Sequence, residues 1–232
     1  MRAYSHGVTT TPTPPALEIT DLKFSYQPGQ AWTVNVASLS LAAGEQMLLT
    51  GGSGSGKSTL LQLIAGLLEP TRGRVLVAGE SVFDAVGASR DRLRGRRIGM
   101  IFQTFNLLHG FSAVENVMAS LAFAATAAKD QRPRAIEALQ SLGLTDIDRP
   151  VEAMSVGQQQ RVAVARAVVT NPALVLADEP TASLDPENAS AAMTLIQQSC
   201  RARGAALLCV SHDPAMADRF ALRRSISSLA DH

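Results

Sequence analysis

Residues 46–67 read Gln46-Met-Leu-Leu-Thr-Gly-Gly-Ser-Gly-Ser-Gly-Lys-Ser-Thr-Leu-Leu-Gln-Leu-Ile-Ala-Gly-Leu67. The stretch opens with a short apolar run at 46–50 that suits a buried strand, and it closes with an apolar helix at about 58–67. The residues between fit G-x-x-x-x-G-K-[ST] without departure; they are Gly51, Gly52, Ser53, Gly54, Ser55, Gly56, Lys57 and Ser58. Strand, glycine-rich turn and helix in this order are the context that a phosphate-binding loop requires.

The glycines of this loop give it its chemistry. They adopt backbone conformations closed to other residues, so that successive N–H groups can point at phosphate oxygens. The helix that follows adds the positive end of its dipole. Lys57 is expected to reach the β- and γ-phosphates, the Ser58 hydroxyl is expected to ligate Mg²⁺, and the nucleotide-binding set extends to Thr59. The flanking strand and helix argue against the alternative, a flexible Gly/Ser linker.

A second motif is an apolar strand, 173–177, that ends in Asp178 and Glu179. A near-continuous apolar run is expected where both faces of a sheet are covered. Asp178 at the strand tip is placed to hold Mg²⁺, and Glu179 to orient and deprotonate an attacking water. Taken alone, an Asp-Glu pair after a strand is often only a helix cap. Its combination with the glycine-rich loop favours the functional interpretation.

From about residue 17 to about residue 220, the chain resembles ABC-type ATPases. The stretch Met154-Ser-Val-Gly-Gln-Gln-Gln-Arg161 is similar to the signature Leu-Ser-Gly-Gly-Gln of that family. Ser155, Gly157 and Gln158 match, whereas Met154 replaces Leu and Val156 replaces the first Gly. The resemblance implies a head-to-tail dimer in which this motif contacts the γ-phosphate held by the opposite subunit.

The resemblance assigns four further residues. Gln103 corresponds to a glutamine that senses Mg²⁺ and water and couples to the membrane subunit. Asp185 lies in the loop that faces the dimer partner, and His212 contacts the γ-phosphate and orients Glu179. Tyr26 corresponds to the aromatic residue that stacks on adenine, although its position also suits an ordinary strand residue.

The expected fold is α/β: a P-loop NTPase core with a mostly parallel sheet, an N-terminal antiparallel β subdomain and an inserted α-helical subdomain at about 104–170. Residues 16–232 are expected to form a single domain, and the Thr/Pro-rich residues 1–15 a disordered arm. The patterns predict strands at 17–20, 21–26, 34–41, 46–50, 74–77, 97–102, 173–177 and 206–210, with a closing strand squeezed into 224–229. They predict helices at 58–67, 113–128, 132–142, 156–169 and 186–203, and a short one from 214.

Composition excludes several classes of protein. A formal net charge of +1 gives no electrostatic argument for nucleic acid or an acidic membrane, and the arginines between 90 and 97 alternate with small and apolar residues, as on a solvated edge. The two cysteines, Cys200 in a helix and Cys209 in a strand, suit reduced buried thiols in a cytoplasmic setting. The best apolar run, 113–128, is interrupted and too short to span a bilayer. A role at a membrane therefore requires a partner chain.

The resemblance thus implies an ATP-hydrolysing, Mg²⁺-dependent subunit. It would form a homodimer, or pair with a closely related ABC subunit, on the cytoplasmic face of the inner membrane beneath separately encoded integral membrane permease subunits. Details at 102–108, 157–161 and 212–214 look most like the lipoprotein-releasing and macrolide-exporter branch, which favours export or extraction of a substrate. The alternative is an ABC-type ATPase that regulates cell division or envelope processes. A nucleic-acid or ribosome factor is disfavoured, because the chain shows neither a long coiled-coil insertion nor a second cassette.

One apolar cluster has two interpretations. Phe105, Leu107, Leu108 and Phe111 follow Gln103 closely. They suit either the hydrophobic core or a groove that receives a helix of the membrane partner.

Overall fold

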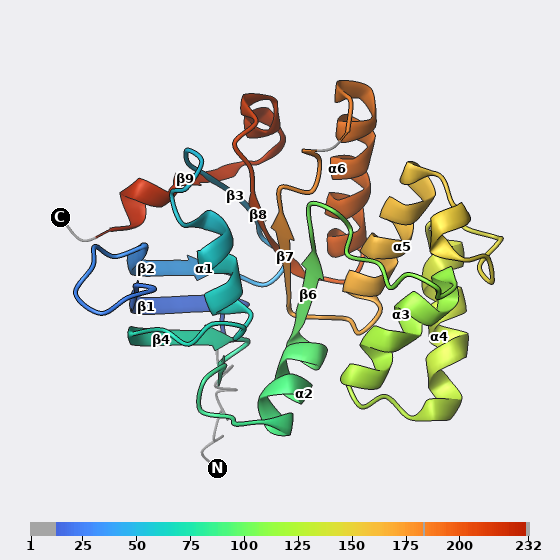
Figure 1. Ribbon diagram of the computed structural model, residues 1–232, viewed down its shortest axis with the longest axis horizontal. Helices are drawn as coiled ribbons and strands as arrows, with labels where there is room; N and C mark the ends of the chain where they lie inside the picture. The colour runs from blue at the N-terminus through green and yellow to red at the C-terminus, as the bar shows by residue number, and fades with distance from the viewer. Residues whose placement is uncertain (1–12, 183, 231–232) are drawn as a thin grey trace, which may run out of the picture.

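A computed structural model describes residues 13–182 and 184–230, so most of the predicted disordered arm lies outside the described residues. Within these ranges the strands form two sheets (Figure 1). An antiparallel sheet has the order β2-β1-β4-β5 and contains β1 (Leu17–Phe24), β2 (Val34–Leu41), β4 (Arg72–Val77) and β5 (Glu80–Ser81). A parallel sheet has the order β6-β7-β8-β3-β9 and contains β3 (Gln46–Thr50), β6 (Ile98–Ile101), β7 (Leu174–Asp178), β8 (Ala206–Val210) and β9 (Leu222–Ser225).

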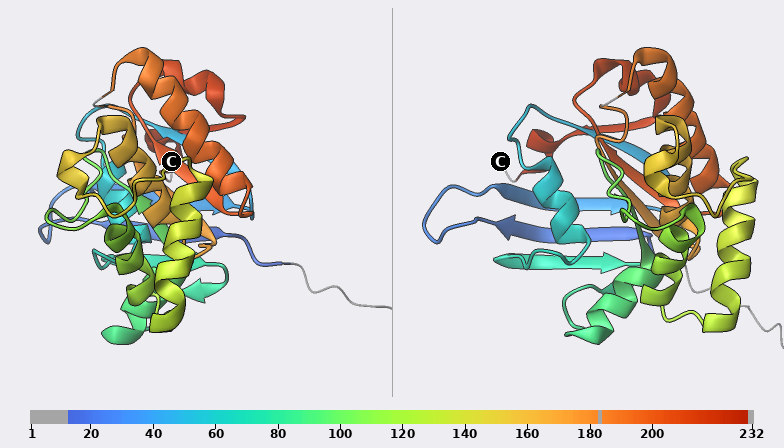
Figure 2. Two further views of the ribbon diagram at one scale, coloured as in Figure 1. Left: turned by 90° about the vertical axis from the view of Figure 1, so that its right-hand side faces the viewer. Right: turned by 45° about the vertical axis from the view of Figure 1, so that its right-hand side comes forward.

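The helices of the described residues flank these sheets. They are α1 (Lys57–Ile64), α2 (Ala88–Arg97), α3 (Ala113–Phe123), α4 (Ala128–Ser141), α5 (Val156–Val168) and α6 (Pro186–Arg201), with short 3-10 turns η1 (Val151–Ala153), η2 (Pro214–Arg219) and η3 (Ile226–Leu229). Helices α3, α4 and α5 group beyond strand β6, while α1 lies by the antiparallel sheet (Figures 1 and 2). The α/β fold class is thereby confirmed. None of the described helices has both the length and the apolar character to cross a lipid bilayer.

The parallel sheet separates two hydrophobic cores. On β7, Leu174 and Leu176 face a core shared with α1 and the antiparallel sheet, whereas Val175 and Ala177 face the core beneath α3, α5 and α6. This division follows from the alternation of side chains along a strand. Because both faces are covered, the strand is apolar throughout, as its sequence predicted.

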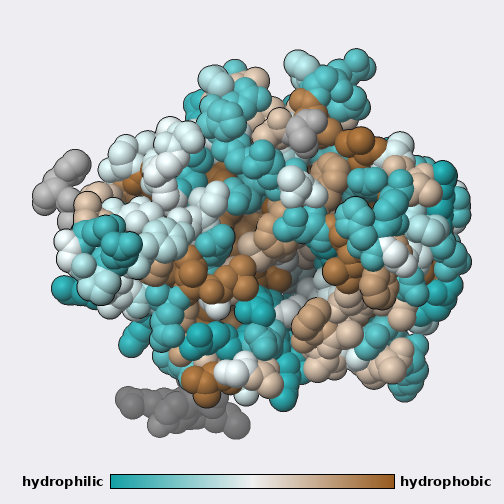
Figure 3. Space-filling model, in the orientation of Figure 1, coloured by the Kyte–Doolittle hydropathy of each residue, from teal (hydrophilic) through white to brown (hydrophobic). Residues whose placement is uncertain are grey.

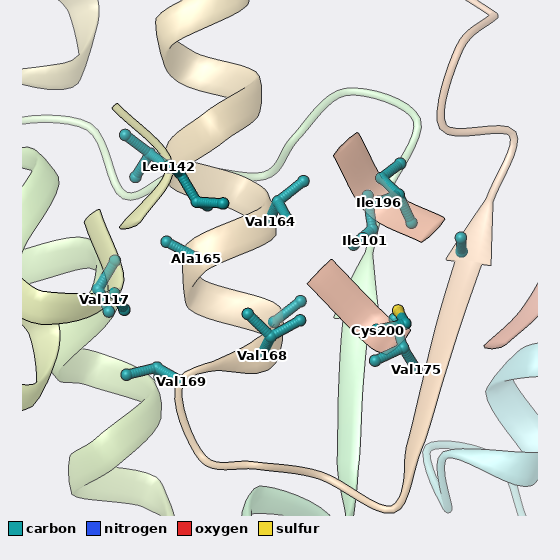
Figure 4. Close-up of a cluster of buried hydrophobic side chains, with 14 of the residues drawn as sticks. Ile101, Val117, Leu142, Val164, Ala165, Val168, Val169, Val175, Ile196 and Cys200 are labelled. Atoms are coloured by element: carbon teal, nitrogen blue, oxygen red, sulfur yellow. The ribbon is translucent and has the colours of Figure 1, made fainter. Parts of the chain in front are cut away.

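Helix α5 lies in the middle of the second core. Figure 4 shows Val164 and Val168 pointing toward the sheet and α6, while Ala165 and Val169 face the helices on the other side. All four side chains are buried. The helix is therefore fixed along both flanks, and its first turn, Val156–Gln158, is not packed into this core.

Several predicted elements needed correction. The two strands expected at 17–26 are one strand, β1, with an irregular register between Thr20 and Lys23 where Asp21 adopts a φ of 48°. Helix α2 was not predicted: none of its residues is buried, so it lacks the apolar stripe that marks a helix in sequence. Helix α3 ends at Phe123 rather than near 128, and α4 begins at Ala128 rather than 132. The closing strand is β9 at 222–225, and residues 226–229 form η3 instead.

Candidate functional site

The phosphate-loop sequence connects β3 to α1. Gly54 and Gly56 adopt φ values of 74° and 87°, which L-residues with side chains rarely adopt. Gly56 is also the N-cap of α1, and a Cβ built there would lie 2.3 Å from the carbonyl oxygen of Thr33. The loop therefore presses against the hairpin between β1 and β2, and glycine at 56 is required by both backbone conformation and packing.

Lys57 folds back into this loop. Its Nζ donates to the carbonyl oxygens of Gly51 at 2.8 Å and Gly52 at 3.0 Å, and the side chain is buried. A buried ammonium group needs such acceptors to offset its lost hydration. The positive charge is thus held inside the curve of the loop, where phosphate oxygens would approach the N–H groups.

Two of the three predicted magnesium ligands meet across the fold. The Ser58 hydroxyl, at the start of α1, donates to Asp178 Oδ1 at 3.0 Å, at the end of β7. Burial raises the pKa of Asp178 above its ordinary value, and the Ser58 hydrogen bond partly opposes that rise. Hydroxyl and carboxylate oxygens are the donors that Mg²⁺ prefers, so this pair fits the ion.

Glu179 and His212 form a second pair beside the first. His212 Nδ1 lies 2.8 Å from Glu179 Oε1, and the backbone N–H of His212 donates to Glu179 Oε2 at 3.3 Å. Glu179 has a φ of 45°, a sparsely populated conformation for a non-glycine residue. Its side chain is 13% exposed, while that of His212 is 65% exposed. A carboxylate aimed by a histidine at the tip of β7 is suitably arranged to act on a water molecule.

Tyr26 lies at the edge of the same region. Its ring packs edge-to-face against Phe24 with centroids 4.9 Å apart, and its hydroxyl lies 3.2 Å from Thr59 Oγ1. The side chain is nevertheless 60% exposed, so its ring remains available to a ligand. Trp32, which sequence reasoning passed over, is a second exposed aromatic residue and directly precedes Thr33, whose carbonyl packs on Gly56.

The signature residues lie elsewhere, at the start of α5. Ser155 caps this helix: its Oγ accepts from Gln158 N at 3.3 Å, and Gln158 Oε1 accepts from Ser155 N at 2.9 Å. A Cβ at Gly157 would meet no atom within 4 Å, and Val156 is 53% exposed. Figure 1 places α5 across β7 from α1, so a single chain does not bring Ser155–Gln158 to its own phosphate loop.

Two other predicted residues are exposed near the ends of parallel strands. Asp185 caps α6 and accepts from the backbone N–H of Asn188 at 3.1 Å and from its side-chain amide at 2.6 Å. Gln103 is exposed in the turn directly after β6. Ser183, two residues before Asp185, lies outside the described part of the chain.

The apolar cluster after Gln103 divides between the two interpretations. Phe105 is buried and Leu107 packs against the core, whereas Leu108 and Phe111 are 43% and 48% exposed. A nearby cavity of about 290 Å³ lies between α2, β6, α3 and α5. The exposed Phe123 lines this cavity. In Figure 3, hydrophobic residues lie beside hydrophilic ones around the recessed centre of the molecule.

Sequence reasoning missed two residues that hold the segment after Gln103. Arg166 on α5 donates to the carbonyl oxygens of Phe105 and Asn106, and Asn116 on α3 binds the backbone of Leu108. Asn116 is wholly buried, which is unusual for an amide side chain. The sequence shows Asn116 only as one of several polar residues on a largely apolar helix, which does not reveal its partner.

Two known proteins have sequences similar to that of this chain. The macrolide export ATP-binding/permease protein MacB of Syntrophobacter fumaroxidans is 39% identical over 206 residues, which cover 87% of this chain but 29% of that protein. The chain therefore spans less than a third of that relative. The lipoprotein-releasing system ATP-binding protein LolD 1 of Caulobacter vibrioides is 43% identical over 195 residues and is covered to 82%, as is this chain.

Solved structures and a family model point to the same kind of protein as these relatives do. The ATP-binding cassette MJ0796, in a dimeric post-hydrolysis state bound to ADP and Pi, superimposes with a TM-score of 0.77 at 32% identity, covering 90% of this chain and 93% of that one. CbiO1 from Clostridium perfringens, part of the ABC transporter complex cbiONQ, gives 0.75 at 29% identity, with 86% and 79% covered. Residues 34–182 match the family model described as ABC transporter. The chain therefore belongs to the ABC transporter family and carries the ATP-binding domain of that family.

Proposed function

We propose that this chain binds Mg·ATP and hydrolyses it to energise export or extraction of a substrate through separate membrane subunits. The observation that carries the proposal is the meeting of two pairs: Ser58 with Asp178, and Glu179 with His212. The first pair supplies ligands for the metal, and the second supplies a base and its orienting group. They are adjacent because Asp178 and Glu179 are consecutive at the end of β7.

Each residue then has a defined task. Tyr26 stacks on adenine, the loop of residues 51–59 holds the phosphates, and Lys57 compensates the charge of the β- and γ-phosphates. Ser58, Asp178 and Gln103 hold Mg²⁺, which would neutralise charge on the phosphates. Glu179 orients a water in line with the γ-phosphate and accepts its proton, while His212 keeps the carboxylate in position.

The isolated chain leaves one part of this site to a partner. Ser155, Gly157 and Gln158 begin α5 away from the phosphate loop of their own chain, and the space beside Gly157 is open. MJ0796 cassettes form dimers in solved structures. We infer that two copies, or this chain and a closely related one, close head to tail, so that these residues and Asp185 complete the nucleotide site of the opposite chain.

Coupling to transport follows from attachment to the membrane. We infer that the dimer lies on the cytoplasmic face of the membrane beneath permease subunits encoded separately. Two supports are the name of LolD 1 as a lipoprotein-releasing system protein and the exposed apolar side chains of Leu108, Phe111 and Phe123. Purification from detergent-solubilised membranes checks this inference: co-purification of a permease supports transport, whereas recovery of a cell-wall hydrolase activator or of ribosomes contradicts it.

The catalytic assignment is tested with Glu179→Gln. The amide preserves the shape of the carboxylate but cannot accept the proton, so ATP binding is expected to persist while turnover falls by about a hundredfold or more. Steady-state ATPase rates and size-exclusion chromatography with Mg·ATP provide the measurements, and a stable ATP-bound dimer is expected. Glu69→Gln, at an exposed carboxylate outside the site, is the matched control. Wild-type turnover by Glu179→Gln would falsify the assignment of the base.

The phosphate loop is tested separately with Lys57→Ala. Removing the ammonium group leaves phosphate charge uncompensated, so ATP affinity is expected to fall by about tenfold or more. Isothermal titration calorimetry measures the change. Unchanged affinity would remove the phosphate loop from the proposal.

A further inference from the structure

The turn after Gln103 has an unusual backbone. Phe105 and Asn106 adopt φ values of 59° and 47°, so two consecutive non-glycine residues occupy the left-handed region. This conformation is sparsely populated and persists only where surrounding groups impose it. Something outside the turn must therefore hold it.

The group that holds it is the guanidinium of Arg166, on α5. Its Nη1 donates to the carbonyl oxygen of Asn106 at 2.5 Å, and its Nη2 donates to that of Phe105 at 2.6 Å. The left-handed backbone turns both carbonyls toward α5, where the planar fork of an arginine can bind them together. Burial also lowers the pKa of Arg166, because the cation loses part of its hydration.

The C-terminal end of α5, which carries Arg166, packs against β6. A Cβ at Gly99 would lie 2.1 Å from the carbonyl oxygen of Ala167, the residue after Arg166, so helix and strand touch backbone to backbone. Strand β6 ends at Ile101 and leads directly to Gln103. The last turns of α5 therefore contact both the strand before Gln103 and the turn after it.

A second helix, α3, fixes the far end of the turn. Asn116, on α3, accepts from Leu108 N at 2.7 Å and donates to Leu108 O at 3.2 Å. Leu108 is thus tied to α3, whereas Phe105 and Asn106 are tied to α5. Of these two attachments, only that of Arg166 belongs to the helix that begins with the signature residues.

We propose that Arg166 is a positioning residue that couples the Gln103 turn to α5, so that Gln103 and Ser155–Gln158 take their working positions together. The helix runs unbroken from Val156 to Val168, and a continuous helix transmits displacement along its length. A shift at its first turn, where the opposite nucleotide would bind, reaches Arg166 and hence the turn. This inference rests on the proposed function.

The inference predicts that loss of Arg166 affects dimer formation and ATP affinity differently. Nucleotide affinity of a single chain depends chiefly on Tyr26 and Lys57, neither of which Arg166 contacts in the described structure. Gln103 is one of three proposed Mg²⁺ ligands, so a displaced Gln103 is expected to change that affinity little. Closure of the dimer depends on the concerted seating of Gln103 and Ser155. Removing the fork is therefore expected to weaken dimer formation and leave ATP binding by dilute protein nearly unchanged.

The experiment uses Arg166→Met in the Glu179→Gln background, with Mg·ATP as the ligand. We expect the dimer dissociation constant to rise by about tenfold or more, the loss that follows from removing charged hydrogen bonds. ATP affinity is expected to change by less than about twofold. Analytical ultracentrifugation measures the first quantity, and titration calorimetry below the dimerisation concentration measures the second.

Arg134→Met is the matched control. Arg134 is also half-buried and donates to a carbonyl, that of Val169 at 2.9 Å, but it does not touch the Gln103 turn. A comparable loss of melting temperature with an unaltered dimer is expected. Arg166→Lys retains the charge without the fork and should give an intermediate dimer constant; it carries the comparison if Arg166→Met does not fold.

The outcomes are distinct. Equal dimerisation of the Arg166 and Arg134 variants overturns the coupling role while the proposed function stands. If Arg166→Met weakens ATP binding as much as dimerisation, its role is that of a general structural contact and the inference is wrong. A Glu179→Gln parent that stays monomeric with bound ATP overturns the proposed dimeric function and, with it, this inference.

Discussion

At the scale of single residues, glycines in one loop occur for different physical reasons. Gly54 has a left-handed φ but open space around it, whereas Gly56 has both a left-handed φ and the Thr33 carbonyl within reach of any Cβ. Gly52 has neither constraint. The sequence shows the same letter at all three positions, so only the structure separates backbone strain from steric exclusion.

This difference predicts unequal costs of substitution. Gly56→Ala is expected to lower the free energy of unfolding by about 2 kcal/mol or more, since the new methyl group must displace the hairpin backbone and adopt a strained φ. Gly52→Ala, the control, is expected to remain within about 0.5 kcal/mol of wild type. Urea unfolding followed by circular dichroism measures both. Equal costs at the two positions would show that the contact with Thr33 relaxes freely.

The candidate site could be predicted where its residues belong to contiguous motifs. The loop of residues 51–58 and the acids at 178–179 have local patterns, and the structure places Ser58 and Asp178 3.0 Å apart. Their roles in binding and catalysis stay predictions. Arg166 and Asn116 could not be found in this way, because their partners are backbone carbonyls and N–H groups, which carry no sequence signal.

At the scale of elements, α3 shows how a cap was predictable. Ser112-Ala-Val-Glu115 has the sequence pattern of a capping box, and the structure forms one: Glu115 Oε2 accepts from the Ser112 backbone N–H at 2.8 Å, and Ser112 Oγ accepts from Glu115 N at 3.4 Å. Two orphan N–H groups at the start of the helix are thereby satisfied. Hydrogen bonds from Ser112 hold the pKa of Glu115 below its ordinary value.

A pH dependence follows from that lowered pKa. The charged form of Glu115 is favoured in the folded state, so its contribution to stability is present above the unfolded pKa and is lost as pH falls through the folded one. Glu115→Gln should therefore be destabilising at neutral pH, and the difference from wild type should shrink below about pH 4. Urea midpoints at both pH values check this. Glu137→Gln, at an exposed position on α4, should show no such trend.

Elements were predictable in proportion to how strongly burial constrained them. Strands β2, β3 and β8 have the bounds that their apolar runs predicted. Helix α2 exposes every side chain to some degree and was missed, because no apolar period marks it. The end of α3 was misplaced because residues 124–127 remain largely apolar after the helix has stopped, and Ala125 turns with a φ of 58°.

At the scale of the whole molecule, one of the two hydrophobic cores on either side of the parallel sheet encloses both cysteines and suppresses their reactivity. Cys200 and Cys209 are both free and fully buried, as predicted, and belong to the core that includes α5 and α6. Figure 4 shows Cys200 in this core. Burial raises the pKa of Cys200 to about 12 and raises that of Cys209 as well. Thiolate, the reactive form, is therefore scarce in the folded protein.

Thiol reactivity is expected to report global unfolding. At pH 8, Ellman's reagent should react with neither cysteine of the native protein, because both thiols are inaccessible and protonated. Both should react within minutes in concentrated guanidinium chloride. Absorbance of the released thiolate gives the count and the rate. Fast reaction of one thiol without denaturant would show that α6 opens locally away from the sheet.

The position of β3 within its sheet has a consequence for biosynthesis. This strand leads into the phosphate loop, yet its hydrogen-bonded neighbours are β8 and β9, which come from the far end of the chain. A nascent polypeptide emerging from the ribosome carries the glycine-rich segment long before either neighbour exists. The phosphate loop can therefore take its folded form only after β8 and β9 have been synthesised, and shorter nascent chains are expected not to bind nucleotide.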